Sequence, residues 1–193
     1  MSRLDALVRT LKAACASRTR VALDRPDKRA AAVLVPLQAV DDAAHLVFTR
    51  RSPALPHHQG QIAFPGGTAD PGDPDAVATA LREAHEEIGV APADVRVLAV
   101  LDDLETVGSG FVITPVVGVV PHPYDWRPCP REVDTIFTVP LATLEDPATA
   151  RRETWDFGGT PWPVDSFAVG EHVIWGATYR ITRNLLDLAR TLA

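Results

Sequence analysis

The spacing of apolar residues alternates along the chain between three-to-four-residue steps and continuous runs, which predicts interspersed helices and strands. Near the N-terminus apolar residues recur at helical steps, and we expect an amphipathic helix over about residues 3–17. Runs rich in valine and leucine at 30–40 and 46–51 predict two strands, and the turn-like Asp41-Asp42 between them favours a hairpin. Further strands are predicted over residues 95–101, 112–120, 135–139 and 166–169, with a short helical turn over 140–144.

The same pattern predicts a central helix and a C-terminal helix. The central helix should begin at Asp73-Pro74, because aspartate caps free N–H groups and proline is tolerated in the first turn, and it should end at Gly89. The C-terminal helix is predicted from about Trp175 to Leu192. One face of the central helix is apolar, so we expect that face to dock on a core; it carries Val77, Leu81, Ala84 and Ile88.

The order of these elements predicts the fold class. Strands and helices alternate without an internal repeat or a long linker, which indicates a single α/β domain over residues 1–193 with a mixed sheet between helices. Its core should cover about residues 30–180. Segments 52–72 and 155–163 are rich in proline and glycine and are predicted as loops.

Composition and charge narrow the range of partners. The chain has 193 residues, of which 46% are hydrophobic and 23% charged, as in ordinary soluble domains. Its net charge of -6 argues against broad binding to nucleic acid or to anionic lipid. Cys15 and Cys129 lie far apart, which suits a reducing compartment, and the longest apolar runs, 30–37 and 112–120, are too short to span a bilayer. We therefore expect a cytoplasmic protein with small-molecule partners.

Three carboxylates on the central helix are the first candidates for chemistry. At about 100° per residue, Glu83, Glu86 and Glu87 fall within an arc of roughly 100°, away from the apolar stripe. Like charges at this spacing destabilise a helix, and a hard divalent cation such as Mg²⁺ would offset the repulsion. The alternative is a solvated acidic face whose repulsion is softened by Arg82 and by the helix dipole.

A glycine pair precedes this helix in the segment Phe64-Pro65-Gly66-Gly67. Two glycines allow the backbone to approach an anion or a metal closely, or to turn a carbonyl toward it. Taken alone, the pair is also compatible with a simple turn.

Together these residues resemble the signature of the Nudix hydrolases, a glycine, an acidic residue and the run R-E-U-x-E-E-x-G-U, where U is apolar. The run here is Arg82 to Val90. Gly67 lies one residue further upstream than is usual, and Asp73 stands where glutamate is common. The resemblance implies an α/β/α sandwich with a mixed sheet, a catalytic loop–helix–loop motif, and hydrolysis of a nucleoside diphosphate derivative with Mg²⁺ or Mn²⁺.

The lengthened loop resembles one subgroup, the coenzyme A pyrophosphatases, whose second motif lies just upstream. Here that motif comprises residues 47–52, Gly60 and residues 64–67, but Pro56 replaces an arginine of the pattern. The resemblance implies cleavage of coenzyme A, or of an acylated or oxidised form, into 3′,5′-ADP and 4′-phosphopantetheine or its derivative. The substrate-binding residues that it implies are Thr49, Arg50, Arg51, Ser52, Gly60, Phe64 and Gly66.

The resemblance also implies roles for the acidic helix. Glu83, Glu86 and Glu87 would bind the metal, with the Gly67 carbonyl as an extra ligand. Arg82 would orient a glutamate through a charge-assisted hydrogen bond. Arg51 and Arg50 are the candidates to meet the 3′-phosphate. Glu83 is the first choice of catalytic base, with Glu105 and Glu132 in reserve.

Several alternatives stay open on the sequence alone. Within the family, the substrate could be ADP-ribose, NADH or a nucleoside triphosphate; outside enzymes, the chain could be a nucleotide sensor without turnover. A zinc site at the adjacent His57 and His58 is disfavoured, because neighbouring side chains point apart and no thiolate accompanies them. The outer helices could form a homodimer contact. Aromatic residues that could stack on adenine, or simply pack, are Phe111, Trp155 and Trp162.

Overall fold

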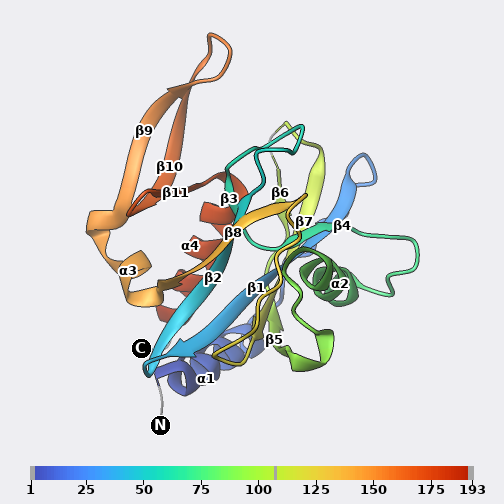
Figure 1. Ribbon diagram of the computed structural model, residues 1–193, viewed down its shortest axis with the longest axis vertical. Helices are drawn as coiled ribbons and strands as arrows, with labels where there is room; N and C mark the ends of the chain where they lie inside the picture. The colour runs from blue at the N-terminus through green and yellow to red at the C-terminus, as the bar shows by residue number, and fades with distance from the viewer. Residues whose placement is uncertain (1–2, 107, 191–193) are drawn as a thin grey trace.

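A mixed sheet of eight strands forms the centre of the computed structural model, which describes residues 3–106 and 108–190 (Figure 1). The main path of the sheet runs β3-β2-β1-β7-β5, with β4 beside β1, β6 beside β7 and β8 beside β2. The strands are β1 (Arg29–Val40), β2 (Ala43–Arg51), β3 (Ile62–Ala63), β4 (Gly66–Thr68), β5 (Arg96–Val100), β6 (Leu104–Glu105), β7 (Phe111–Val119) and β8 (Val133–Pro140).

Strand β1 is the central strand because it is apolar on both faces. It pairs in parallel with β7 and antiparallel with β2 and β4. Leu34 packs with the helix on one face of the sheet, whereas Val35 belongs to the core on the other face. A strand that is buried on both sides requires a covering layer on each.

Helices supply both layers. Helix α2 (Ala76–Ile88) covers one face, where its Ala80, Ala84 and Ile88 pack with β1. Helices α1 (Arg3–Ala16) and α4 (Gly176–Arg190) cover the other face and pack against each other. The predicted α/β/α sandwich with a mixed sheet and outer helices is therefore confirmed, although Leu192, the predicted end of the last helix, lies outside the described residues.

A second, three-stranded sheet projects from the body as an arm, drawn in orange to red in Figure 1. It consists of β9 (Ala150–Asp156), β10 (Pro161–Val169) and β11 (His172–Trp175), and it follows the short helix α3 (Leu141–Glu145). The prediction of a loop over 155–163 was wrong there, because β9 and the start of β10 are exposed and show no alternation of buried and exposed positions. Single-turn 3-10 helices lie at Pro92–Asp94 and Pro147–Thr149.

The boundaries of α2 correct one prediction and confirm another. The N-cap is Asp75, whose carboxylate accepts the Ala78 N–H at 2.8 Å, so the predicted start at Asp73-Pro74 was two residues early. Asp73 is unavailable as a cap because its carboxylate binds Arg82 instead. At the other end Gly89 takes the left-handed conformation, as its prediction as the stop requires.

The glycine pair has a structural role that the sequence did not reveal. Gly66 begins β4, a strand missed inside the predicted 52–72 loop, and lies opposite Val33 of β1. Its φ is +157°, and a Cβ at this position would lie 2.3 Å from the Ala32 carbonyl oxygen. Only glycine allows the loop to pair this closely with the central strand.

None of the helices within residues 3–106 and 108–190 is long and apolar enough to cross a membrane.

We predict that Gly66→Ala lowers the free energy of unfolding by at least about 2 kcal/mol, because the added methyl meets backbone that cannot move aside cheaply. The matched control is Gly72→Ala, where no atom lies within 4 Å of the new Cβ, and the change should stay within about 0.5 kcal/mol. Urea unfolding of the three proteins measures both values; equal midpoints would contradict the role given to Gly66.

Candidate active site

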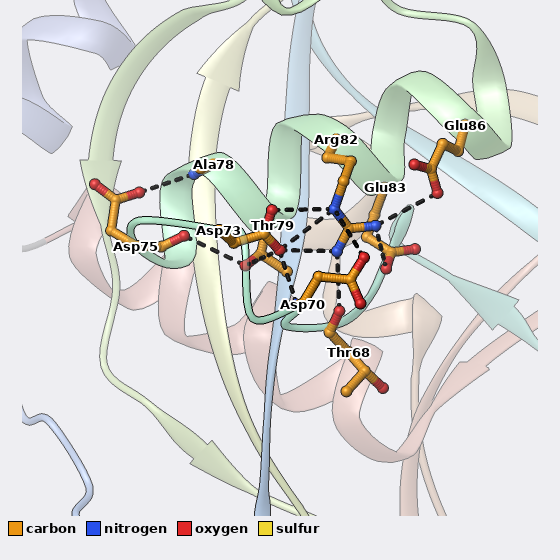
Figure 2. Close-up of polar contacts among 9 residues, drawn as sticks. All are labelled: Thr68, Asp70, Asp73, Asp75, Ala78, Thr79, Arg82, Glu83 and Glu86. Carbon is orange, nitrogen blue, oxygen red and sulfur yellow. Dashed lines mark hydrogen bonds and ion pairs between the residues drawn. The ribbon is translucent and has the colours of Figure 1, made fainter.

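Arg82 lies at the centre of the polar face of α2 and joins the helix to the loop before it (Figure 2). Its Nε and Nη2 donate to the Asp73 carboxylate at 3.1 and 2.9 Å, and Nη2 also donates to the Thr68 carbonyl at 3.0 Å. Its Nη1 donates to Glu83 at 2.9 Å and to Glu86 at 3.4 Å. One guanidinium thus binds both the loop and two of the three helix carboxylates.

Asp73 completes the clamp on the loop side. Its carboxylate also accepts the Thr79 hydroxyl at 2.9 Å and the Asp70 N–H at 3.0 Å. The hydrogen bonds from Arg82 hold the pKa of Asp73 well below its usual range, so this group stays charged. The aspartate that replaces the usual glutamate therefore fixes the lengthened loop against α2.

Glu87 is the most shielded of the helix carboxylates. Its side chain projects toward β4, and the residue is only 4% exposed. The Gly66 N–H donates to its Oε2 at 3.2 Å. Burial raises the pKa of Glu87 to about 8, helped by the charges of Glu132 and Glu83 and opposed by Gly66 and Arg51. A nearby cation would therefore stabilise the ionised form of this buried carboxyl group.

Glu83 and Glu86 occupy less buried positions. Glu83 is half-buried, and burial raises its pKa against the opposing effect of Arg82. A Cβ at position 67 would lie 2.5 Å from the Glu83 Oε2, so Gly67 is required to leave room for that carboxylate. Glu86 is exposed on the next turn.

This donor set fits a hard divalent cation, which prefers carboxylate oxygens and would offset the charge repulsion between Glu83 and Glu87. The three carboxylates do not converge on one point, since Arg82 binds Glu83 and Glu86 and the Gly66 N–H binds Glu87. Accordingly, within residues 3–106 and 108–190 no three acidic, histidine or cysteine side chains are grouped as a metal site.

The two adjacent arginines of β2 lie in different surroundings. The charge of Arg51 acts on Glu87, and its Nε is buried without a hydrogen-bond partner in the described part of the chain. Arg50 instead donates from Nε to Asp134 at 2.7 Å. Alternation along a strand explains the divergence and leaves Arg51 as the cation beside the acidic helix.

Three of the predicted substrate-binding residues are buried and have partners within the protein. Thr49 donates to the Ala63 carbonyl at 3.1 Å, and Ser52 donates to the Pro130 carbonyl at 3.1 Å. Phe64 packs in the core against Phe48, with ring centroids 4.9 Å apart. These three motif residues therefore stabilise the strand and the loop, and their contact with a substrate stays a prediction.

The two reserve bases separate clearly. Glu105 is bound by Arg25 and by Lys28, whose Nζ lies 2.5 Å from Oε1, and the Lys28 hydrogen bond lowers its pKa, which weakens it as a base. The half-buried Glu132 lies near enough to Glu83 and Glu87 for its charge to act on both. The structure therefore brings Glu132 near the acidic helix and pairs Glu105 with Arg25 and Lys28.

A pocket of about 330 Å³ opens on the other side of β2, and sequence reasoning missed most of it. We call it the Arg50 pocket; it is lined by Arg50, Gln59, Gly60, Gln61, Ile62, Glu171, His172, Val173 and Trp175. Only Arg50 and Gly60 belong to the predicted substrate-binding residues. The others come from the loop before β3, from the first residue of β3, and from β11 and the turn before it, which carry no recognisable motif.

The remaining aromatic and histidine candidates have local partners. His58 Nδ1 lies 3.0 Å from the Gln61 Oε1, and no metal group includes it among the described residues. The Arg29 guanidinium lies 4.1 Å from the ring centroid of Phe111, as a cation–π pair. Trp155 packs on Trp175, which lines the Arg50 pocket.

Comparisons with known proteins agree with this site. The family model described as "NUDIX domain" matches residues 28–156. The chain is 39% identical to the uncharacterized Nudix hydrolase NudL of Photorhabdus laumondii subsp. laumondii over 159 residues, which are 82% of this chain and 84% of that protein. It is 44% identical to NudL of Klebsiella pneumoniae subsp. pneumoniae over 116 residues, which are 60% of this chain and 59% of that protein.

A solved structure shares the fold. The NUDIX hydrolase from Alicyclobacillus acidocaldarius superposes with a TM-score of 0.55 at 20% identity, covering 88% of this chain and 96% of that one. At this identity the likeness concerns the arrangement of helices and strands alone.

We predict that Glu87→Gln stabilises the metal-free protein at alkaline pH. Between the ordinary glutamate value of 4.5 and about 8, the folded state binds one more proton than the unfolded state, so stability falls as pH rises through this window. The variant should lack this decline, have a higher urea midpoint than the parent at pH 8, and match it near pH 4. A parent whose midpoint does not fall across the window would contradict the buried state of Glu87.

Proposed function

The chain belongs to the Nudix hydrolase family, and we propose that it hydrolyses the diphosphate bond of coenzyme A or of an acylated coenzyme A, giving 3′,5′-ADP and 4′-phosphopantetheine or its acyl derivative. The observation that carries the hydrolytic assignment is the shielded Glu87, which lies on the same helix α2 as Glu83 and near Arg51 of β2. The choice of coenzyme A is supported by the resemblance of residues 47–67 to the second motif of that subgroup.

Glu83, Glu86 and Glu87, with the Gly67 carbonyl, would hold Mg²⁺ or Mn²⁺ in this proposal. The bound cation would neutralise charge on the diphosphate and make a water molecule more acidic. Their oxygens are the donor type that such cations prefer, and the repulsion among them is the reason a cation would be bound.

The protein's own groups divide the remaining work. Glu83 is the preferred general base, because burial raises its pKa and Arg82 fixes its orientation. Glu132 is the reserve base. Arg51, whose Nε has no acceptor within the described residues, would donate to a phosphate oxygen of the diphosphate, since it lies beside Glu87. This position favours the diphosphate over the 3′-phosphate as its target.

A second candidate substrate within the family is a diphosphate without a 3′-phosphate, such as ADP-ribose or NADH. Pro56 favours it, because the arginine that the coenzyme A pattern has at this position is missing. Incubation with Mg²⁺ and coenzyme A, dephospho-coenzyme A, ADP-ribose, NADH or dATP, with products identified by mass spectrometry, separates the candidates. Faster cleavage of ADP-ribose than of coenzyme A would overturn the proposed substrate but keep the hydrolase.

We predict that Glu83→Gln lowers kcat by about 100-fold or more, because the amide accepts no proton and binds cations weakly. The matched control is Glu145→Gln on α3, whose carboxylate pairs with Arg190 at 3.9 Å and should leave turnover unchanged. Circular dichroism and steady-state kinetics of both variants provide the measurement. Turnover by Glu83→Gln at the rate of the parent would exclude Glu83 as base and as ligand.

We predict that Arg51→Gln lowers kcat/KM by about 10- to 100-fold for coenzyme A and dephospho-coenzyme A alike, because a charge-assisted hydrogen bond to the shared diphosphate is lost. The control is Arg9→Gln on the exposed side of α1, which should change neither value. A loss confined to coenzyme A would instead assign Arg51 to the 3′-phosphate.

A further inference from the structure

The Arg50 pocket is joined to the acidic helix through a single residue of β2. The Gly60 N–H donates to the Arg51 carbonyl at 3.1 Å, and the Arg51 N–H donates to the Gln61 carbonyl at 2.9 Å. The Arg51 side chain in turn acts on Glu87. One wall of the pocket is therefore bonded to the residue that flanks the catalytic carboxylates.

A column of stacked rings also connects the two places. His172 of the pocket stacks on Phe137 with centroids 3.9 Å apart, Phe137 lies 5.8 Å from Phe48, and Phe48 lies 4.9 Å from Phe64. Phe64 is two residues before Gly66, whose N–H binds Glu87. Because packed rings cannot shift independently, the pocket has a fixed position relative to the carboxylates.

Beyond the pocket, aromatic side chains continue along the projecting arm. Trp175 lines the pocket and lies 5.1 Å from Trp155 and 6.1 Å from Phe157 between ring centroids. Trp162 is the cross-strand partner of Trp155 and is 53% exposed. We call Trp155, Phe157 and Trp162 the aromatic face. A pocket that leads onto exposed aromatic surface fits a long ligand with an apolar end.

The residues that line the pocket are suited to bind a chain that contains amide groups. The carboxamides of Gln59 and Gln61 can donate and accept, and Ile62 and Val173 supply apolar contact. The rings do not form an open slot for a purine, since His172 is already stacked and Trp175 packs edge-on against Trp155.

We propose that the Arg50 pocket binds the pantetheine arm of the substrate, with its two amides, and that the aromatic face binds an acyl group carried on the thiol. This proposal rests on the proposed function and assigns a place to the half of the substrate that lies beyond the scissile bond. It makes an acylated coenzyme A a better substrate than the free thiol, because the acyl chain covers aromatic surface that is otherwise exposed to water.

The two products of coenzyme A cleavage, 4′-phosphopantetheine and 3′,5′-ADP, serve as separate probes of the pocket. In the full chain, Trp175→Leu and, as a second variant that leaves the arm packing intact, Gln61→Ala should raise the Kd of 4′-phosphopantetheine at least tenfold, measured by calorimetry with Mg²⁺. The Kd of 3′,5′-ADP, measured on the same samples, should stay within about twofold and serves as the folding control.

Unchanged 4′-phosphopantetheine binding in both variants would overturn the pocket assignment. Weakened binding of 3′,5′-ADP alone would overturn it too and would place the nucleoside there. If the parent binds 4′-phosphopantetheine in the pocket but cleaves no coenzyme A, the proposed function fails while the pocket assignment stands, so the two failures are distinguishable.

The aromatic face is tested with octanoyl-coenzyme A against free coenzyme A. The parent should prefer the acylated substrate, and Trp162→Ser should lower this ratio of kcat/KM values by about fivefold or more. The matched control is Val21→Ser, which removes an equally exposed apolar side chain, also 53% exposed, outside the arm. A ratio of one in the parent, or equal ratios in the parent and Trp162→Ser, would overturn the role of the aromatic face.

Discussion

The ion pair between Arg82 and Asp73 is the interaction on which the candidate site depends. It joins the loop to α2 across nine residues, and the same guanidinium fixes Glu83 and Glu86. Without the Arg82 guanidinium between them, the carboxylates of Asp73, Glu83 and Glu86 would repel one another. The pair therefore does two things at once: it holds the loop that brings Gly67 against Glu83, and it lowers the repulsion that would otherwise displace the helix.

A second constraint opposes the first. Glu87 is buried against Gly66, where its ionised form is unfavourable, so the folded protein carries an electrostatic cost at its most shielded carboxylate. This cost follows from the close pairing of β4 with β1, which places the Gly66 backbone next to Glu87 of α2. Such a conflict between local stability and arrangement is typical of functional sites, and under the proposed function a bound cation resolves it.

The parts of the fold that bury an apolar face were predictable from sequence, because periodicity reports burial. The stripe that ends at Ile88 and the two-sided run of β1 both lie in the core as expected. Strand β9 and the first part of β10 were missed because these residues are exposed and show no alternation of buried and exposed positions, whereas the strand predicted over 166–169 lies within β10. The Arg50 pocket was unpredictable for another reason: Gln61 and His172 are brought together by the contact of β11, in the second sheet, with β3 in the first. Likewise, Glu105 and Glu132 were equal candidates for the base on sequence alone. The structure distinguishes them, because Glu105 pairs with Lys28 whereas the charge of Glu132 acts on Glu83.

Strand β2 gives the adjacent arginines different tasks through simple alternation. The register of β2 with β8 shifts between Arg50 and Arg51, so that Asp134 is the extra residue on β8 and meets Arg50. The charge of Arg50 is thereby balanced by Asp134 on the pocket side, whereas the charge of Arg51 acts on Glu87. Under the proposed function, the diphosphate binds on the side of Arg51 and the bound cation, whereas the pocket, where Arg50 is paired with Asp134, takes the uncharged amide chain. Under the proposed function, alternation along β2 thus separates the side of the sheet that binds the diphosphate from the side that binds the group attached to it.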